Sequence, residues 1–277
     1  MCVICGAPPL PDPYYDMGDW KVVRCSSCTY AWVVDVQPDT SAFSWSDDIV
    51  DESGLRGGMY EARLRRVEKL SPSPKSWLDV GCGGGGMLTC AQRAGYAVEG
   101  IELSPAGDVI ESRYGIPMHR KPLADVMGEL KQAQYGVISY FHVLEHVWNP
   151  VEELNTARQR LGEGSVLVVE VPFFDSLPWR ISGHRHRHFA RGHRSYFNRK
   201  SLAALLAATG FTPISMTTVA YWMSFGWLLE RLGHQGKWGA PFRPLHRILP
   251  NGLRRLPFPL YIGDVVFVLA RPADRRA

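Results

Sequence analysis

Residues 76–86 read Ser-Trp-Leu-Asp-Val-Gly-Cys-Gly-Gly-Gly-Gly, a short apolar run that leads directly into glycines. The run over 76–80 is typical of a buried strand, and a helix is expected over 87–94. A second strand is expected over 97–103, with Glu102 at its end. A strand, a glycine turn, a helix and an acid about 20 residues further on are the parts of a nucleotide-binding βαβ unit.

The residues within this glycine turn carry a closer resemblance. Asp79-Val80-Gly81-Cys82-Gly83-x-Gly85 resembles motif I of class I S-adenosylmethionine-dependent methyltransferases, and Ile101-Glu102-Leu103-Ser104 resembles motif II. The resemblance implies that the glycine backbone lies against the methionine part of the cofactor and that Glu102 holds the ribose. It also implies an α/β fold with a doubly wound, mostly parallel seven-stranded sheet. The cofactor-binding residues expected from the match are Asp79, Gly81, Cys82, Gly83, Gly85, Glu102, Leu103, Leu123 and Phe141.

Residues 135–146 resemble the fourth strand of the same family with its His-x-Leu-Glu-His ending. Glu145 and His146 are expected to close the strand, as such residues do in family members with different substrates. His142 is a candidate for catalysis, because ligands bind at the carboxyl ends of strands in open α/β sheets. Further elements expected here are a helix over 150–161 and a buried strand over 165–171.

Four of the six cysteines form two Cys-x-x-Cys pairs, Cys2 with Cys5 and Cys25 with Cys28. Two such pairs can bring four thiolates around one zinc ion. Disulfides are the alternative, but they are uncommon in a reducing cytoplasm, and the N-terminus lacks the basic and apolar regions of a signal peptide. We therefore expect a zinc ribbon whose Zn²⁺ is structural, since four protein ligands leave no open position on the metal.

A second dense cluster spans residues 184–199, which hold four histidines and five arginines. It follows the fifth expected strand, where loops of a doubly wound sheet cover the binding crevice. Such a segment could bind a second metal, grip an anionic acceptor through arginine, or supply a histidine base. His184, His186 and His188 would share one face of an extended chain. The metal site is the least favoured of the three, because the stretch contains no carboxylate or thiolate.

Part of this cluster resembles zinc-ribbon methyltransferases that act on deoxysugars. The match runs through Gly192-His193-Arg194-Ser195-Tyr196-Phe197 and continues at Ser201-Leu202 and Gly210-Phe211. In those enzymes the matching histidine abstracts the acceptor proton, so the resemblance implies that His193 is the base and that Tyr196 orients substrate beside it. The alternative for His193 is a loop residue that caps the following helix. The substrate contacts expected nearby are His188, Arg191 and Arg194.

The chain divides into three expected parts: a zinc ribbon over 1–36, a linker with a helical lead-in over 37–75, and a methyltransferase domain over 76–277. Insertions at about 172–197 and 220–260 are expected to cover the substrate. The second insertion interrupts the last β-hairpin, and residues 221–232 carry apolar side chains at helical spacing. It could cover the active site, form the face of a homodimer, or lie on a membrane surface.

The net charge of +4 hides an uneven distribution. Residues 176–277 hold 16 lysines and arginines against 3 acids, whereas residues 1–175 hold 15 against 24. The basic half favours an anionic partner, unless the two halves pack together and neutralise each other. No apolar run approaches the roughly 18–20 residues that cross a bilayer, so a cytoplasmic protein is expected.

These features predict a biosynthetic enzyme that transfers a methyl group from S-adenosylmethionine to a small anionic acceptor, such as a nucleotide-linked sugar or a natural-product intermediate. Two alternatives remain open. A zinc ribbon and a basic half could grip RNA phosphates, although the ribbon has no surplus of Lys or Arg. The chain could also be a degenerate methyltransferase that only binds or scaffolds, which the intact motif I and Glu102 argue against.

Overall fold

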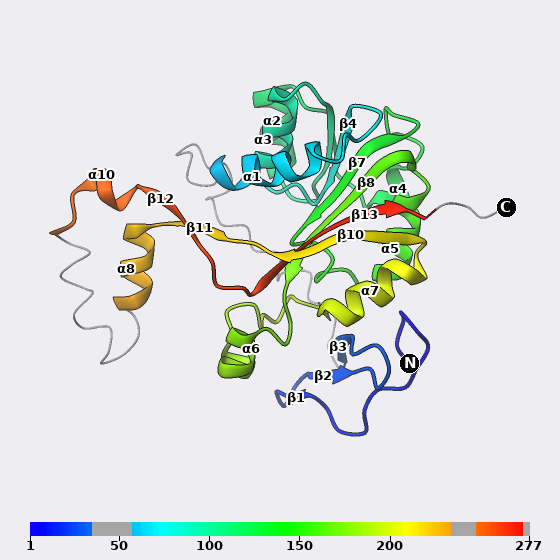
Figure 1. Ribbon diagram of the computed structural model, residues 1–277, viewed down its shortest axis with the longest axis vertical. Coiled ribbons are helices and arrows are strands. Elements are labelled where there is room, and N and C mark those ends of the chain that lie inside the picture. The colour runs from blue at the N-terminus through cyan, green and yellow to red at the C-terminus, as the bar shows by residue number, and fades with distance from the viewer. Residues whose placement is uncertain (35–56, 234–247, 274–277) are drawn as a thin grey trace.

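The computed structural model describes residues 1–34, 57–233 and 248–273 (Figure 1). Its largest unit is a seven-stranded sheet in the order β10-β13-β8-β7-β4-β5-β6. In this sheet only β13 runs against its neighbours, pairing antiparallel with β8 and β10. The predicted doubly wound, mostly parallel sheet is confirmed. Its strands are β4 (Ser76–Val80), β5 (Ala97–Ile101), β6 (Met118–His119), β7 (Tyr135–Phe141), β8 (Leu161–Pro172), β10 (Phe211–Thr218) and β13 (Val265–Pro272).

Helices cover both faces of the sheet, because alternate residues of each strand point to opposite sides. In β7, Val137 belongs to one hydrophobic cluster and Ile138 to the other. The Val137 face packs against α1 (Gly57–Glu68), α2 (Gly86–Arg93) and α3 (Ala106–Tyr114). The opposite face packs against α4 (Leu123–Val126), α5 (Pro150–Arg158) and α7 (Arg199–Ala208).

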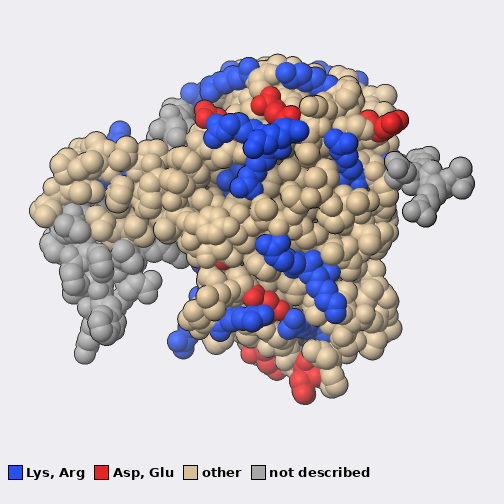
Figure 2. All heavy atoms as spheres, in the orientation of Figure 1, with Lys and Arg blue, Asp and Glu red and all other residues tan. Residues whose placement is uncertain are grey.

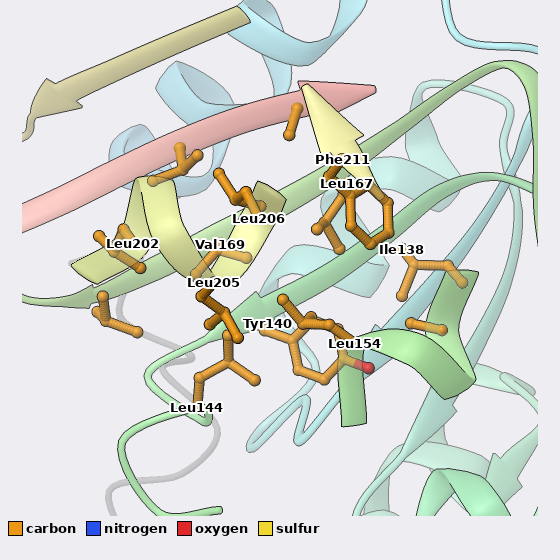
Figure 3. Packing of buried hydrophobic residues seen from close by; sticks show 14 of the residues in the cluster. Ile138, Tyr140, Leu144, Leu154, Leu167, Val169, Leu202, Leu205, Leu206 and Phe211 are labelled. Atoms are coloured by element: carbon orange, nitrogen blue, oxygen red, sulfur yellow. The ribbon is translucent and has the colours of Figure 1, made fainter. Parts of the chain in front are cut away.

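Figure 3 shows how α7 seals the second face. Leu202, Leu205 and Leu206 lie over Val169 of β8, close to Tyr140 of β7. Each of these leucines is at least 99% buried, which contributes about 1.5–3 kcal/mol per side chain. The helix begins at a capping box, in which the Asn198 side chain accepts a hydrogen bond from the backbone N–H of Ser201.

The N-terminal region forms a second sheet, of four strands, in the order β1-β2-β3-β9. Three of its strands lie near the N-terminus: β1 (Tyr15–Asp16), β2 (Lys21–Arg24) and β3 (Ala31–Val34). The fourth, β9 (Ser195–Tyr196), belongs to the histidine-rich segment and follows α6 (Leu177–Ser182) and the 3₁₀ turn η3 (Gly183–Arg185). The N-terminal region therefore shares a sheet with the main domain, on the lower side of Figure 1.

A separate arm leaves the main sheet between β10 and β13 (Figure 1). It consists of a two-stranded ladder of β11 (Tyr221–Ser224) and β12 (Pro257–Leu260), with α8 (Phe225–Gly233) and α10 (Asn251–Arg254) beyond it. Among the residues that the structure describes, no helix is long and apolar enough to cross a membrane.

Several predicted boundaries were wrong. The helix expected over 150–161 ends at Arg158, because Leu161 already pairs with Tyr135 as the first residue of β8. The strand expected over 97–103 ends at Ile101, where the next residue turns toward the glycine loop.

The histidine segment and the arm also differ from expectation. Residues 184–188 are not extended, because Gly183–Arg185 forms a 3₁₀ turn, although the rings of His186 and His188 lie 5.5 Å apart between centroids. Of the helix expected over 221–232, the first four residues form β11, since they pair with β12. The linker expected at the start of 37–75 lies largely outside the described residues.

A buried ion pair fixes α1 to the sheet. Arg63 donates from Nε to Glu170 Oε2 at 2.9 Å and from Nη2 to Glu170 Oε1 at 3.1 Å, and both side chains are at least 95% buried. Removing one partner of such a pair leaves the other charge buried without compensation.

We predict that Arg63→Met lowers the free energy of unfolding by about 3 kcal/mol, because it removes both guanidinium hydrogen bonds from the buried Glu170 carboxylate and leaves only the His142 ring, at 3.5 Å, to face it. Urea unfolding monitored by circular dichroism measures the change. The control Arg65→Met breaks an exposed pair with Glu61 and should cost less than about 0.5 kcal/mol. Equal losses of stability for the two variants would contradict the conclusion that the Arg63–Glu170 pair fixes α1 to the sheet.

Candidate functional site

The cofactor-side residues meet at the carboxyl ends of β4 and β5. Gly81, Gly83 and Gly85 adopt φ angles of 67°, 55° and 74°, which glycine tolerates and other residues rarely adopt. Glu102 lies opposite this turn and is 7% exposed. Its Oε2 accepts the backbone N–H of Gly83 at 2.9 Å, and its Oε1 accepts the N–H of Ser104 at 2.9 Å. The predicted acid is thus aligned with the predicted turn.

The turn leaves room for a ligand on one side only. A Cβ on Gly81 would collide with Val143 at 2.5 Å, and one on Gly86 would collide with the Tyr60 ring at 2.2 Å. A Cβ on Gly83, by contrast, would meet nothing within 4 Å. Open space at Gly83 beside a carboxylate with spare lone pairs fits a ligand that carries a ribose, so the residues present suit S-adenosylmethionine.

Asp79 lies behind this turn, at the end of β4, and is 2% exposed. Its Oδ1 accepts a hydrogen bond from Ser139 at 2.5 Å, and Ser139 in turn accepts from the Trp77 indole at 2.7 Å. Burial raises the pKa of Asp79 to about 7, although the Ser139 hydrogen bond opposes the shift. Asp79 therefore supports the loop from beneath.

The remaining residues predicted to bind the cofactor differ in how far they are buried. Leu103 is 60% exposed, whereas Leu123 is 1% exposed and packs within the core. Phe141 is the last residue of β7 and is partly buried. Cys82 donates its backbone N–H to Ile101, and burial raises the pKa of its thiol well above the usual value.

His142 follows β7 in the left-handed region, with φ of 57°. Its Nδ1 lies 3.2 Å from Glu145 Oε1, and its Nε2 lies 3.5 Å from Glu170 Oε1. Burial lowers the pKa of His142, but hydrogen bonds and charges from the two carboxylates outweigh burial and raise it to about 10. The ring is therefore an imidazolium at neutral pH, with both nitrogens directed at acids and no lone pair for a substrate proton.

His193 has the opposite electrostatic character. It is 8% exposed, and its Nδ1 has no hydrogen-bond partner among the described residues. Burial lowers the pKa of His193 to about 4, although the charge of Glu145 opposes the shift, so the ring is neutral at pH 7. One ligand atom of each of Glu145, His146 and His193 lies within 4.8 Å of the others. Glu145 Oε2 is also buried and has no hydrogen-bond partner in the part of the chain that the structure describes.

The predicted substrate contacts separate into three environments. Arg194 lies over the exposed Trp148 ring at 4.4 Å, and its buried Nη1 has no hydrogen-bond partner among the described residues. Arg191 is exposed and pairs with Asp19 of the N-terminal region. His188 stacks on His142 at 6.0 Å between ring centroids, and burial lowers its pKa to about 3.

Tyr196 is 2% exposed and has its pKa raised by burial. Its ring stacks on Phe189 at 5.6 Å between centroids, within the cluster that joins the N-terminal region to α6. The helix that follows is capped by Asn198, so the structure gives the capping role to that residue and not to His193.

The four N-terminal cysteines converge as their spacing predicts. Their sulfur atoms all lie within 4.8 Å of one another, with 3.6 Å between Cys2 and Cys28 and 3.5 Å between Cys5 and Cys25. Sulfurs of a tetrahedral zinc site with bonds of about 2.3 Å are about 3.8 Å apart, so the four thiols fit Zn²⁺. All six cysteines lie in the described ranges, and none forms a disulfide.

Sequence reasoning missed the buried charges around this site. Glu170, within the apolar strand β8, binds both Arg63 and His142. Asp264, at the start of β13, accepts two hydrogen bonds from Arg187 at 2.7 and 3.0 Å. An acid inside an otherwise apolar strand was the available signal for Glu170, because such a residue is rarely buried without a partner.

A protein-family model described as a methyltransferase domain matches residues 55–216, more than half of the chain. The chain belongs to this methyltransferase family. The predicted enzyme class, a SAM-dependent methyltransferase, is confirmed.

Two curated relatives of the methyltransferase are named for ubiquinone biosynthesis. It is 30% identical over 129 residues to the mitochondrial ubiquinone biosynthesis O-methyltransferase of Candida albicans, across 43% of this chain and 39% of the relative. It is 28% identical over 123 residues to the Hydrogenovibrio crunogenus enzyme of that name, across 41% of this chain and 51% of the relative. The matches thus span about two fifths to half of these relatives.

Solved structures share the fold. A SAM-dependent methyltransferase from Archaeoglobus fulgidus aligns with a TM-score of 0.52 at 18% identity, over 79% of this chain and 96% of that one. The 1,6-didemethyltoxoflavin-N1-methyltransferase of Burkholderia thailandensis, solved with S-adenosylhomocysteine, aligns with a TM-score of 0.50 at 17% identity, over 95% and 100%.

We predict a pH-dependent effect of Asp79→Asn on stability. Because the pKa of Asp79 is higher in the folded chain than in the unfolded one, the folded chain binds the extra proton between about pH 4 and pH 7, and stability from this group falls as pH rises across that window. The amide mimics the protonated acid. The variant should therefore match wild type near pH 4 and exceed it by about 4 kcal/mol at pH 8 in urea unfolding.

The control for this experiment is Asp108→Asn, whose side chain is 75% exposed and should give no such pH-dependent gain. A stability difference between Asp79→Asn and wild type that is the same at both pH values would contradict the protonation of Asp79 in the folded chain.

Proposed function

We propose that the methyltransferase acts on a hydroxyl of a small anionic acceptor, such as a nucleotide-linked sugar or a carboxylated natural-product intermediate, with His193 as the general base. The relatives' name, O-methyltransferase, supports an oxygen acceptor for this chain. A hydroxyl needs a base to become a good nucleophile, and a neutral histidine can accept its proton.

The observation that carries this proposal is the pair of buried acceptors without donors. His193 Nδ1 and Glu145 Oε2 both lack hydrogen-bond partners among the described residues. Unpaired buried acceptors cost free energy, and a substrate hydroxyl would supply the missing donor to one of them. The neutral ring of His193 can then take that proton, while the anionic Glu145 stabilises the imidazolium that forms.

The position of this pair relative to the cofactor loop also supports the proposal. Val143 contacts Gly81 of the glycine turn, and two residues later Glu145 lies beside His193. The segment 142–146 therefore spans from the cofactor side to the acceptor side. When bound, S-adenosylmethionine supplies an electrophilic methyl group, so the residues around it need mainly to align the acceptor and exclude water.

An anionic acceptor is supported by Arg194. Its guanidinium has a buried N–H without a partner among the described residues and is braced by Trp148. Arg191, already paired with Asp19, and His188, beside Asp264, are weaker candidates for direct contact. Figure 2 shows several groups of basic side chains on one face, with acids beside some of them.

We further propose that Cys2, Cys5, Cys25 and Cys28 hold one structural Zn²⁺. The convergence of the four sulfurs supports a closed site, which would lend the N-terminal region the stability that its few residues lack. In this proposal the ribbon covers 1–36, the methyltransferase domain covers 76–277, and the insertions at about 172–197 and 220–260 flank the acceptor.

The test is methyl transfer from radiolabelled S-adenosylmethionine to a panel of nucleotide-linked sugars, carboxylated intermediates and phenolic hydroxyl compounds. His193→Ala should lower kcat by about 10²–10⁴-fold on any active acceptor while S-adenosylhomocysteine binds as before. The control His184→Ala changes an exposed histidine of the same segment and should retain activity. Near wild-type turnover by His193→Ala would contradict the assignment of the base.

A further inference from the structure

Backbone pairing joins the proposed zinc-ribbon region to the segment that carries the proposed base. Strand β3 pairs with β9, with Ala31 opposite Tyr196 and Trp32 opposite Ser195. The N–H of Val33 also donates to the carbonyl of Arg194 at 3.0 Å. The strand that receives these bonds begins two residues after His193. The N-terminal region thus forms one side of the segment that carries the proposed base.

Tyr30 connects the cysteines to this segment. Its hydroxyl lies 2.6 Å from Ser195 Oγ, and both residues are 1% exposed. Its carbonyl accepts the backbone N–H of Cys25 at 2.7 Å, and Cys28 precedes it by two residues in the chain. Tyr30 therefore contacts a cysteine of the four-sulfur site at its backbone and the acceptor segment at its side chain.

The main domain holds the same segment from the other side. The carbonyl of Glu145 accepts the N–H groups of Arg194 and Ser195, at 2.6 and 3.0 Å. Ser195 Oγ also lies 3.3 Å from the carbonyl of Val147. The segment therefore lies between the loop after β7 and the N-terminal region, and its placement depends on both.

The hydrophobic packing follows the same route. Cys2, Cys25, Cys28 and Tyr30 belong to one buried cluster with Phe197 and with leucines of α7. The Tyr30 ring lies 5.4 Å from that of Phe197, between centroids. A region of this size has too small a core of its own to order without a metal, so the order of Tyr30 should depend on the metal in the cysteine site.

We propose that Tyr30 is a positioning residue for His193, and that metal in the four-cysteine site fixes the acceptor segment while leaving the cofactor loop unaffected. In this methyltransferase the N-terminal ribbon would therefore hold the acceptor-binding segment in place. This inference rests on the proposed role of His193, but the placement of the segment can be measured without any acceptor.

The test is hydrogen exchange on the full-length chain, with zinc content measured by elemental analysis. After zinc is removed by a chelator, the amides of Ser195 and Tyr196 should exchange at least about 10-fold faster. Tyr196 loses its pairing with Ala31 of β3, and Ser195, whose N–H donates to Glu145, lies in a segment that β3 no longer holds in place. The amides of Asp79 and Val80 should change less than about 2-fold, and S-adenosylhomocysteine affinity should be retained.

A matched pair of variants separates the effect of the Tyr30 hydroxyl from the effect of the metal. Tyr30→Phe should keep its zinc and its ring packing, yet speed exchange at Ser195 by about 3–10-fold through loss of one buried hydrogen bond. Tyr96→Phe, at a buried tyrosine on the other face of the sheet, should leave that exchange unchanged.

Three outcomes would overturn the inference. Equal protection of Ser195 and Tyr196 with and without zinc would show that the ribbon does not fix them. Loss of protection at Asp79 and Val80 as well would show that the ribbon stabilises the whole domain. Slow exchange at Ser195 in a chain purified with no zinc bound would show that metal is not needed. Loss of S-adenosylhomocysteine binding by the zinc-loaded chain would instead contradict the methyltransferase assignment, which separates the two failures.

Discussion

The parallel pairing of β4 with β5 and with β7 is the constraint on which the rest of the structure depends. It places the carboxyl ends of three strands at one edge of the sheet, so that the glycine turn, Glu102 and the segment after Phe141 emerge together. Val143 also lies close to Gly81, which brings the loops after β4 and β7 together. The proposed acceptor side is therefore adjacent to the glycine turn.

A line of charges, all buried except the partly exposed His142, stabilises this edge. Arg63 of α1 binds Glu170 of β8, Glu170 faces His142, and His142 faces Glu145. Two cations and two carboxylates alternate along the line, so each charge has an opposite neighbour. Its last member, Glu145, lies beside His193, and its Oε2 has no hydrogen-bond partner among the described residues. The two carboxylates thus raise the pKa of His142, whereas burial lowers the pKa of His193, so the two histidines differ in charge at neutral pH.

The sequence predicted features that depend on residues close together in the chain and missed contacts between residues far apart in it. The glycine turn, Glu102 and the cysteine pairs could be predicted because each chemistry depends on residues close together in the chain. The contact of Tyr30 with Ser195 joins residues 165 positions apart, and periodicity carries no information about such pairs. The same limit hid the contact of Glu170 with His142, whereas Glu145 lies only three residues from that histidine. Secondary structure failed where tertiary pairing decided it, as in β11, whose aromatic residues also suit a helix.

The most direct test of the account is a calorimetric titration of the folded, zinc-loaded chain with S-adenosylhomocysteine. The account predicts binding with a Kd on the order of micromolar that is lost in Glu102→Ala, because the carboxylate beside Gly83 holds the ribose. Glu111→Ala, at an exposed acid of the neighbouring helix α3, should bind like wild type. Absence of binding by the folded wild-type chain, or unchanged binding by Glu102→Ala, would contradict the assignment of this edge as the cofactor site.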